Sequence, residues 1–172
     1  ILDKLLSFNK LSDCKKIINA RGELDLSAHK DYVCMENNEY RLIRGDHIDG
    51  KRLKEPGESQ KDGFVNFGEF IELCSLERRK YISQPRIAIS QCSYLKKKKR
   101  IETCITDKDM IISNSCNFLA FEEGNHFFYY YTWINSSVIE WYFRMFSYNN
   151  HVANYELADL PIISYQEATI EF

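Results

Sequence analysis

The strongest constraint on the fold is a series of alternating segments in the second half of the chain. Beyond Pro85, the segments "RIAISQCSY", "RIETCIT" and "MIISNSCNFLAF" alternate apolar and polar residues, and "LKKKK" and "DKD" separate them. Alternation with a period of two is typical of half-buried strands. Residues 85–121 are therefore predicted to form consecutive strands of a mostly antiparallel sheet.

A helical pattern follows these strands. Apolar residues recur at steps of three and four between residues 126 and 147, which places them on one face of a helix. They are Phe127, Tyr130, Ile134, Val138, Trp141 and Met145. We expect one amphipathic helix over residues 126–147 on one face of the sheet, with Trp141 in the core. The opposite side or an edge of the sheet is then expected to meet a partner.

The first half of the chain has weaker patterns. Strand-like segments occupy residues 14–26 and 40–48, and the turn formers and charges of residues 54–63 predict the main internal loop. Residues 64–82 mix both periods and are interpreted as a helix. Leucines at helical spacing predict a short connecting helix over residues 1–9.

Together these segments predict an α+β fold in which a twisted, mostly antiparallel sheet from residues 14–26, 40–48 and 85–121 carries the helix. A chain of 172 residues suits one domain, here residues 10–172, and a hydrophobic share of 44% is typical of globular proteins. The chain opens at Ile1, so we expect it to be part of a longer protein. With neither a leader nor an apolar run of about 18 residues, a cytoplasmic location is expected.

Charge is distributed unevenly along the chain. The formal net charge is -2, yet the segment from Glu77 to Arg100 holds nine Lys or Arg and one acid, and the segment from Glu122 to Phe172 holds one Arg and seven acids. Attraction of phosphate depends on the local field more than on the total charge. The segregation therefore predicts a positive surface that suits a nucleic-acid partner.

Catalytic and cofactor motifs do not appear in the sequence. Gly63 and Gly68 have the spacing of a phosphate-binding loop, but Glu69 and Phe70 follow where that loop needs Lys and Ser or Thr. There is no G-x-S-x-G, H-E-x-x-H or C-x-x-C element, and the histidines lack ligand spacing. We expect no catalytic residue, metal or cofactor site in this chain.

Two kinds of charged residue remain as candidates for DNA contact. The first is a run between two predicted strands, where a hairpin tip would present five positive charges to a phosphate backbone. It comprises Lys96, Lys97, Lys98, Lys99 and Arg100. The alternative interpretation of this run is a solvated loop.

The second kind consists of isolated charges beside glycine or at strand starts: Arg21, Glu23, Arg44 and Arg86. A guanidinium pairs with guanine through two hydrogen bonds, and a carboxylate accepts one from cytosine. The alternative is a set of ordinary surface ion pairs, Arg21 with Glu23 and Arg44 with Asp46.

Several motifs together resemble one protein family. The stretch "IISNSCNFLAF", the helix "FFYYYTWINSSVIEWYFRMFS" and "NNHVANYELADLPI", preceded by "ARGELDL", "YRLIRGDHI" and "PRIAIS", closely resemble the C-terminal specificity region of TaqI-like adenine DNA methyltransferases and type IIG restriction-modification enzymes. The resemblance implies a target recognition domain of a bacterial enzyme that binds double-stranded DNA. It also implies a separate catalytic domain of the same parent chain, which binds S-adenosylmethionine and methylates adenine, in some members beside an endonuclease domain.

The resemblance also assigns roles to particular residues. Arg21, Gly22 and Glu23 match the family's early R-G-E element, Arg44 and Gly45 its R-G element, Arg86 its R-I strand, and Asn149, Asn150 and His151 its loop after the helix. It favours DNA contact, or a role in shaping the DNA-facing surface, for the isolated charges. For Asn149 to His151, DNA contact and a helix C-cap with a turn remain equal alternatives.

The sequence thus predicts a DNA target recognition domain without a catalytic site of its own. Two other hypotheses remain open. One is half of a type I restriction specificity subunit, which would require a second copy of the domain. The other is a protein-interaction domain that has lost DNA binding, although the clustered basic residues argue against it.

Overall fold

The structure is a computed structural model, and it describes residues 1–35, 40–122, 127–165 and 168. Its centre is a four-stranded sheet in the order β2-β11-β8-β9, in which every neighbouring pair is antiparallel. The strands are β2 (Ile17–Arg21), β8 (Arg86–Ser90), β9 (Thr103–Thr106) and β11 (Cys116–Phe121). The α+β class and the antiparallel arrangement of the later strands are confirmed.

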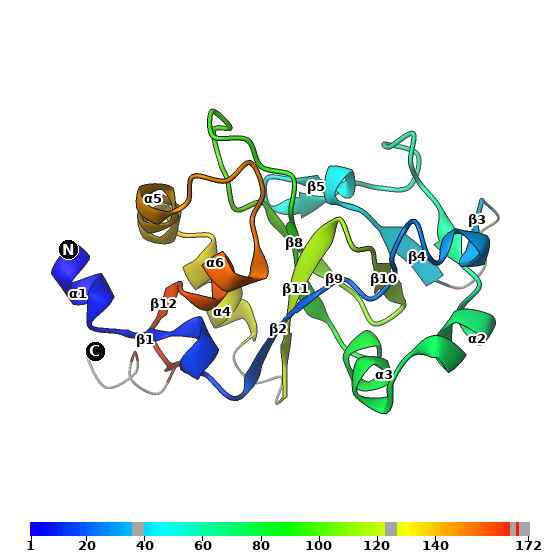
Figure 1. Cartoon of the computed structure of the whole chain (residues 1–172), viewed down its shortest axis with the longest axis horizontal. Coiled ribbons are helices and arrows are strands. Elements are labelled where there is room, and N and C mark those ends of the chain that lie inside the picture. The colour runs from blue at the N-terminus through cyan, green and yellow to red at the C-terminus, as the bar shows by residue number, and fades with distance from the viewer. Residues whose placement is uncertain (36–39, 123–126, 166–167, 169–172) are drawn as a thin grey trace.

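A second four-stranded sheet lies beside the first, in the order β10-β4-β7-β3 (Figure 1). Its strands are β3 (Val33–Cys34), β4 (Tyr40–Ile43), β7 (Phe64–Val65) and β10 (Met110–Ile112). The pair β10–β4 is parallel, and the other two pairs are antiparallel. The expectation of a single sheet was therefore wrong, because residues 40–43 pair with β7 and β10 and not with the central strands.

Two short ribbons complete the strand pairing. The first joins β1 (Asn9–Lys10) to β12 (Pro161–Ile162), so it links the two ends of the chain. The second is the hairpin of β5 (Ile48–Asp49) and β6 (Arg52–Leu53), which turns at Gly50. Gly50 has a φ of 66°, a left-handed conformation that glycine adopts without steric cost.

The predicted 126–147 helix is two helices, α4 (Phe127–Ile134) and α5 (Ser137–Phe146). His126 lies outside the described residues. The chain breaks because the Asn135 side chain turns inward and donates to the Thr103 hydroxyl (2.7 Å), while the Ser136 hydroxyl accepts from the Ile139 amide (3.2 Å) and starts a new helix. The break changes which residues of α5 face the core, and Trp141, expected there, is 44% exposed.

The remaining helices are short. They are α1 (Leu2–Leu6), α2 (Phe67–Phe70), α3 (Leu76–Ile82) and α6 (Asn154–Ala158), with 3₁₀ turns η1 (Leu11–Asp13), η2 (Lys30–Tyr32), η3 (Gly45–His47) and η4 (Ile71–Leu73). The single helix expected over residues 64–82 is therefore wrong: the segment holds β7, α2, η4 and α3. Its mixed periodicity reflects this sequence of short elements.

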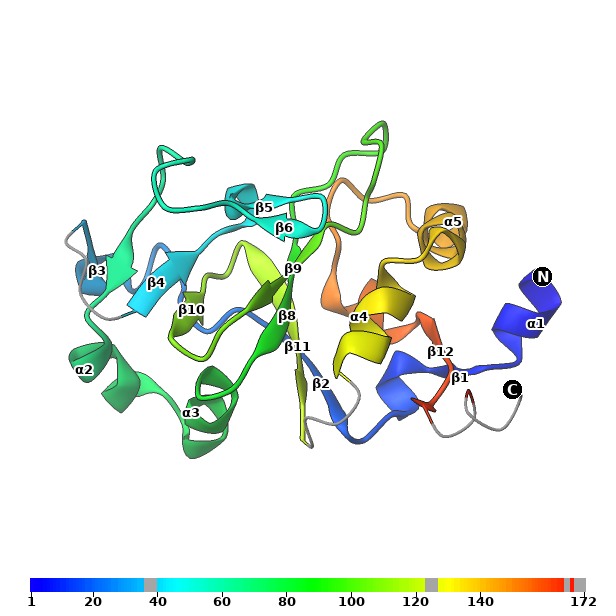
Figure 2. The same cartoon turned by 180° about the vertical axis from the view of Figure 1, so that it is seen from behind.

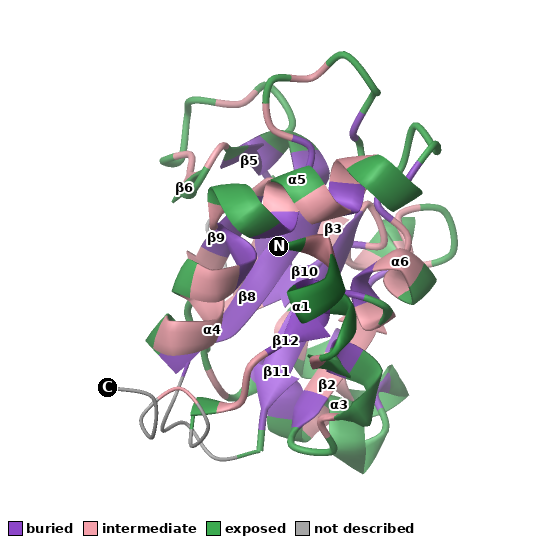
Figure 3. Cartoon of the chain, turned by 90° about the vertical axis from the view of Figure 1, so that its left-hand side faces the viewer, coloured by how far each residue is buried: buried purple, intermediate pink, exposed green. Residues whose placement is uncertain are grey.

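Both faces of the central sheet are covered (Figures 2 and 3). Ile87, Ile89 and Leu119 pack with α4, α5 and α6 on one face, whereas Ala88 and Phe118 pack with residues of the second sheet on the other. Every residue of β8 and β11 is buried as a result. The face opposite the helices is thus covered by the second sheet, and only the ends and edges of the central sheet remain for a partner.

No helix among the described residues has the length and apolar character needed to cross a membrane.

Candidate nucleic-acid interface

One end of the central sheet gathers loops from separate parts of the chain (upper side of Figure 1). The end of β2 and the end of β8 both lie here, because Arg21 is opposite Asn117 and Ser90 is opposite Cys116 at the start of β11. The sheet therefore brings the loops that follow β2 and β8 next to the loop that precedes β11.

Two further segments join the same end. Gly45, the second residue after β4, donates its backbone N–H to the Ser115 hydroxyl (2.9 Å). The segment after α5 is tied to the loop after β8, since the Val152 amide donates to the Gln91 carbonyl (3.0 Å) and His151 forms a bridge with Cys92. These links bring the segments after β2, β4, β8 and α5 together beside the loop that precedes β11.

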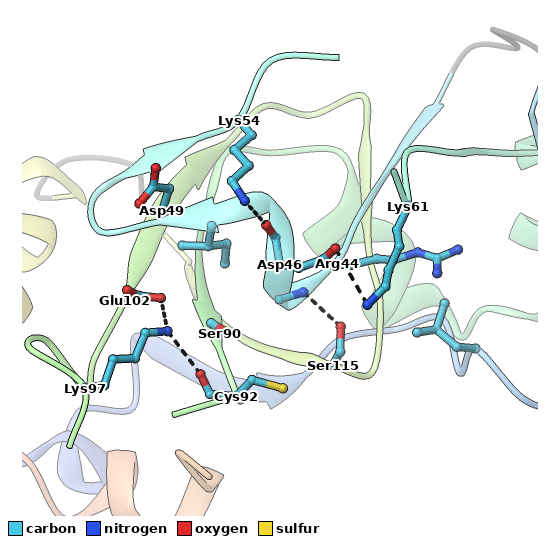
Figure 4. Close-up of a pocket in the computed structure, with 13 residues that line it drawn as sticks. Arg44, Asp46, Asp49, Lys54, Lys61, Ser90, Cys92, Lys97, Glu102 and Ser115 are labelled. Carbon is cyan, nitrogen blue, oxygen red and sulfur yellow. Dashed lines mark hydrogen bonds and ion pairs between the residues drawn. The ribbon is translucent and has the colours of Figure 1, made fainter. Parts of the chain in front are cut away.

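A hollow of about 450 Å³ opens between these loops, and we refer to it as the trough (Figure 4). Its walls are the 44–61 segment and the loop between β8 and β9. Its floor is tightly packed, because a Cβ on Gly45 would lie 3.0 Å from both the Ser115 carbonyl oxygen and the Ser90 hydroxyl. The lining residues are Leu26, Arg44, Gly45, Asp46, Ile48, Asp49, Lys54, Lys61, Ser90, Cys92, Lys97, Glu102 and Ser115.

The trough holds four cations, and neighbouring acids and carbonyls position three of them. Lys54 Nζ donates to the Asp46 carbonyl (2.7 Å), and Lys61 Nζ lies 3.8 Å from the Asp46 carboxylate. Lys97 Nζ lies 2.5 Å from the Glu102 carboxylate. An ammonium group has three donors, so each lysine retains donors for a ligand.

Arg44 and Arg21, both predicted from the sequence, belong to this end. Arg44 is the fourth cation and is half-buried in the trough wall, where its amide donates to Nδ1 of the buried His47 (3.3 Å). Arg21 is exposed, and its Nε donates to the Asn114 carbonyl (3.0 Å) in the loop before β11. Because that bond aims the guanidinium, Arg21 presents its remaining donors from a fixed position.

His47 supports the turn that carries Arg44. Burial is the main reason why the pKa of His47 is lowered, so the imidazole is neutral at pH 7 and Nδ1 can accept the Arg44 amide. Its Nε2 lies 3.6 Å from Asp62 Oδ1, at the end of the loop that carries Lys61. His47 thus lies between the two segments that form one wall of the trough.

Arg86 and Glu23 do not present atoms to a ligand, contrary to the expectation of DNA contact. Arg86 Nη1 donates to both Glu23 carboxylate oxygens (3.0 and 2.9 Å), and the side chains are 0% and 2% exposed. Arg86 also donates to the Met110 carbonyl (2.7 Å), and Glu23 accepts from the Ile112 amide (2.9 Å). This ion pair ties the central sheet to β10 of the second sheet.

The lysine run does not present five charges together either, although it lies between β8 and β9 as predicted. Lys96 and Lys98 are exposed, whereas Lys97 pairs with Glu102 and Lys99 donates to Asn135 Oδ1. Arg100 is fully buried and donates to the carbonyls of Ser147 (2.8 Å) and Asn149. Lys99 and Arg100 both point inward because the loop packs against the turn between α4 and α5 and the end of α5.

The basic segment from Glu77 to Arg100 also does not form one surface. Arg78, Arg79 and Lys80 lie on α3, at the opposite end of the central sheet from the loop of residues 91–100 (Figure 1). Strand β8 separates the two groups. The cations of the trough, which stand among the acids Asp46, Asp49 and Glu102, come instead from residues 44–61 and from the loop between β8 and β9.

Asn149, Asn150 and His151 reach the same end, but they do not form the expected helix C-cap, because α5 is capped at Ser147. The alternative, DNA contact, stays a prediction. Asn149 is structural, since its side-chain amide donates to the Tyr155 hydroxyl (2.7 Å) and to Glu156 (3.1 Å). The Asn150 carbonyl accepts from the Ser93 amide (3.2 Å). The side chains of Asn150 and His151 are exposed beside Cys92, so these two remain candidates for contact.

Two lysines of the trough were not among the predicted residues. Lys54 and Lys61 belong to the segment interpreted only as an internal loop. The charges within this turn-rich segment were the only sequence feature that pointed to it. The residues that hold the segment against the trough, Asp46 and His47, belong to the preceding turn η3.

Comparison with known families identifies the chain. The model of the TaqI-like C-terminal specificity domain matches residues 30–162, and the chain belongs to this family. It is a DNA-recognition specificity module of restriction-modification enzymes. No curated protein matches the chain. Within the described ranges, no group of three or more His, Cys, Asp or Glu side chains is placed to hold a metal ion.

Proposed function

We propose that this chain selects the target sequence of an adenine-specific DNA methyltransferase and that it binds duplex DNA at the trough. The parent methyltransferase either lacks an endonuclease domain or is fused to one. The observation that carries the proposal is the convergence of Arg21, Arg44, Lys54 and Lys61 on one hollowed end of the sheet. Arg21 ends β2, whereas Arg44, Lys54 and Lys61 belong to the 44–61 segment. Loops on a rigid scaffold are where binding residues are usually found.

The cations at this end suit two tasks in DNA binding. Arg21 and Arg44 carry planar guanidinium groups beside strand ends, and they suit hydrogen bonds to base edges, above all to guanine. Lys54 and Lys61 are point charges on the outer wall and suit the phosphate backbone, which fixes position without reading sequence. The Asn150 and His151 side chains extend the surface on the side of α6.

The methyl transfer is assigned to a separate catalytic domain. Nucleotide-type cofactors are usually bound at a glycine-rich turn between a parallel strand and a helix. In the residues that the structure describes, the glycines with positive φ are Gly50 and Gly57, and neither joins a strand to a helix. In our proposal S-adenosylmethionine therefore belongs to the catalytic domain of the parent chain.

A survey of DNA methylation tests the proposal. Cells that express the complete gene should contain N6-methyladenine at one short motif, as found by single-molecule sequencing. Arg44→Ala should add related motifs that differ at one position, whereas the matched control Arg78→Ala, on α3, should leave the motif unchanged. Methylation of cytosine instead of adenine would contradict the assigned reaction. Unchanged methylated motifs in both Arg21→Ala and Arg44→Ala would contradict the proposal that these arginines read the DNA sequence.

A further inference from the structure

The loop between β8 and β9 exposes two large apolar side chains at its tip. Tyr94 is 61% exposed and Leu95 is 47% exposed, on a loop that projects beyond the rest of this end of the molecule (Figures 1 and 2). The Lys97 amide donates to the Tyr94 carbonyl (3.0 Å), so residues 94–97 form a tight turn with Leu95 and Lys96 at its centre. The turn directs both apolar side chains away from the core.

The backbone of this tip is held by several bonds to the body of the protein. Arg144 on α5 donates to three carbonyls of the loop: Leu95 (3.4 Å), Lys97 (2.6 Å) and Lys98 (3.0 Å). Buried Arg100 anchors the following residues to the segment after α5. A tip that is fixed in advance loses little conformational entropy when it binds.

The charges beside the tip indicate the chemistry of its partner. Lys96 and Lys98 follow the apolar pair in the same loop, are exposed, and take part in no ion pair among the described residues. The same loop forms one wall of the trough through Cys92 and Lys97. An apolar projection beside two exposed cations suits a polyanion with apolar interior faces, which is the chemistry of stacked bases within a phosphate backbone.

A second exposed apolar surface on the molecule lacks this combination. It surrounds a cavity of about 400 Å³ that is lined by Leu6, Phe146, Tyr148 and Tyr155, among others, and its charged residues are Lys10, Glu156 and Asp159. Lys10 is paired with Asp159 at 2.7 Å. The lining of that cavity offers no lysine outside an ion pair, so the loop tip is distinguished by the exposed Lys96 and Lys98 and not by apolar exposure alone.

We propose that Tyr94 and Leu95 insert between neighbouring base pairs of the bound duplex and unstack them, while Lys96 and Lys98 contact the flanking phosphates. This inference rests on the proposed function, because it takes duplex DNA at the trough as the partner. Apolar wedges of this kind kink DNA, and the cost of unstacking depends on the base step. The loop therefore contributes to sequence preference without a hydrogen bond to any base.

Photocrosslinking tests the insertion directly. Duplexes selected from a random library for binding to the wild-type chain would carry 5-iodouracil in place of thymine at successive positions. Irradiation should join one or two adjacent positions to Tyr94, as located by mass spectrometry. Tyr94→Phe should keep the crosslink, and the double variant Tyr94→Ala/Leu95→Ala should bind about 10-fold or more weakly.

Matched controls separate this inference from the proposed function. Phe128→Ala and Leu76→Ala remove comparably exposed apolar groups elsewhere (71% and 84% exposed) and should leave affinity unchanged, with melting temperatures measured for all variants. If the wild-type chain binds its duplexes but crosslinks only from other residues, or if the double variant binds as tightly, the insertion is wrong and DNA recognition stands. If the wild-type chain binds no duplex, both proposals are overturned.

Discussion

The junction of the two sheets and the end of the central sheet use the same residue types in opposite ways. At the junction, Arg86 and Glu23 neutralise each other without access to solvent. At the sheet end, Arg21 is exposed and Arg44 is half-buried beside a hollow. The comparison shows that a charged residue's partners and burial decide whether it holds the fold together or is available to contact DNA bases. Its residue type and its position beside a strand do not decide this.

Removal of the Arg86–Glu23 ion pair between the two sheets should have the largest effect, a loss of stability. Arg86→Ala should lower the free energy of unfolding by about 3–5 kcal/mol, because it leaves the Glu23 carboxylate buried without its partner. Chemical denaturation followed by fluorescence measures this. The double variant Arg86→Met/Glu23→Leu should recover part of the loss, since no lone charge remains. An Arg86→Ala protein of normal stability and altered DNA preference would show that Arg86 reads DNA.

Substitution of Arg44 at the trough should weaken DNA binding and leave the free energy of unfolding nearly unchanged. Arg44→Ala should weaken binding to the preferred duplex by about 1–3 kcal/mol and reduce discrimination at one base pair, because a bidentate contact is lost. Competition binding with duplexes that carry each single substitution measures both quantities. A uniform loss across all duplexes would instead make Arg44 a backbone contact.

Lys99, in the loop between β8 and β9, is expected to make the stability of the protein depend on pH. Burial, with repulsion from Lys51 second, lowers the pKa of Lys99 from 10.5 to about 8 in the folded protein. Below pH 8 Lys99 is charged in both states and folding carries the full desolvation cost. Between pH 8 and 10.5 the folded state has released a proton that the unfolded state still holds, so stability rises with pH.

This effect is isolated by comparison with Lys99→Met. The free energy of unfolding of the wild type, minus that of the variant, should increase by roughly 1–3 kcal/mol between pH 8 and 10.5. Urea denaturation at a series of pH values provides the measurement. A difference that stays constant over this interval would mean that the Lys99 ammonium is not desolvated.

The smallest expected effect is on the salt dependence of DNA binding, and it distinguishes the exposed lysines of the β8–β9 loop from the lysine that is paired with an acid. Removing Lys96 and Lys98 together should reduce the slope of log affinity against log salt by about 1.8, at roughly 0.9 per phosphate contact. Lys97→Ala should change it less, because Glu102 already partly neutralises that charge. Lys108→Ala, in the exposed turn between β9 and β10, is the control. Equal changes for Lys97 and the outward pair would contradict the assigned orientations.

Strands β8 and β9 of the central sheet could be predicted because they follow one another in the chain and alternate clearly. The segment "MIISNSCNFLAF", expected as one strand, is instead divided between β10 of the second sheet and β11 of the central sheet. The second sheet was missed because β3 and β7 have two residues each, too few to show a period. The break at Asn135 was missed because apolar residues keep helical spacing across it, although the pair Asn135–Ser136 favours helix ends and starts.

The candidate site was predictable only in part. Arg21 and Arg44 were found because they stand beside glycine at strand ends. The burial of Arg86 was not predictable, because its partner Glu23 is 63 residues away in the sequence. Lys54 and Lys61 join the site through contacts that depend on the tertiary fold, and a run of lysines does not reveal which side chains point inward.

The central claim is that duplex DNA is bound at the trough end of the sheet and not at the basic helix α3. Benzoylphenylalanine placed at Lys61, and in a second protein at Arg78, tests it by photocrosslinking to duplexes selected by the wild-type chain. The account predicts a crosslink from position 61 at defined nucleotides and none from position 78. A crosslink from position 78 with none from position 61 would contradict it.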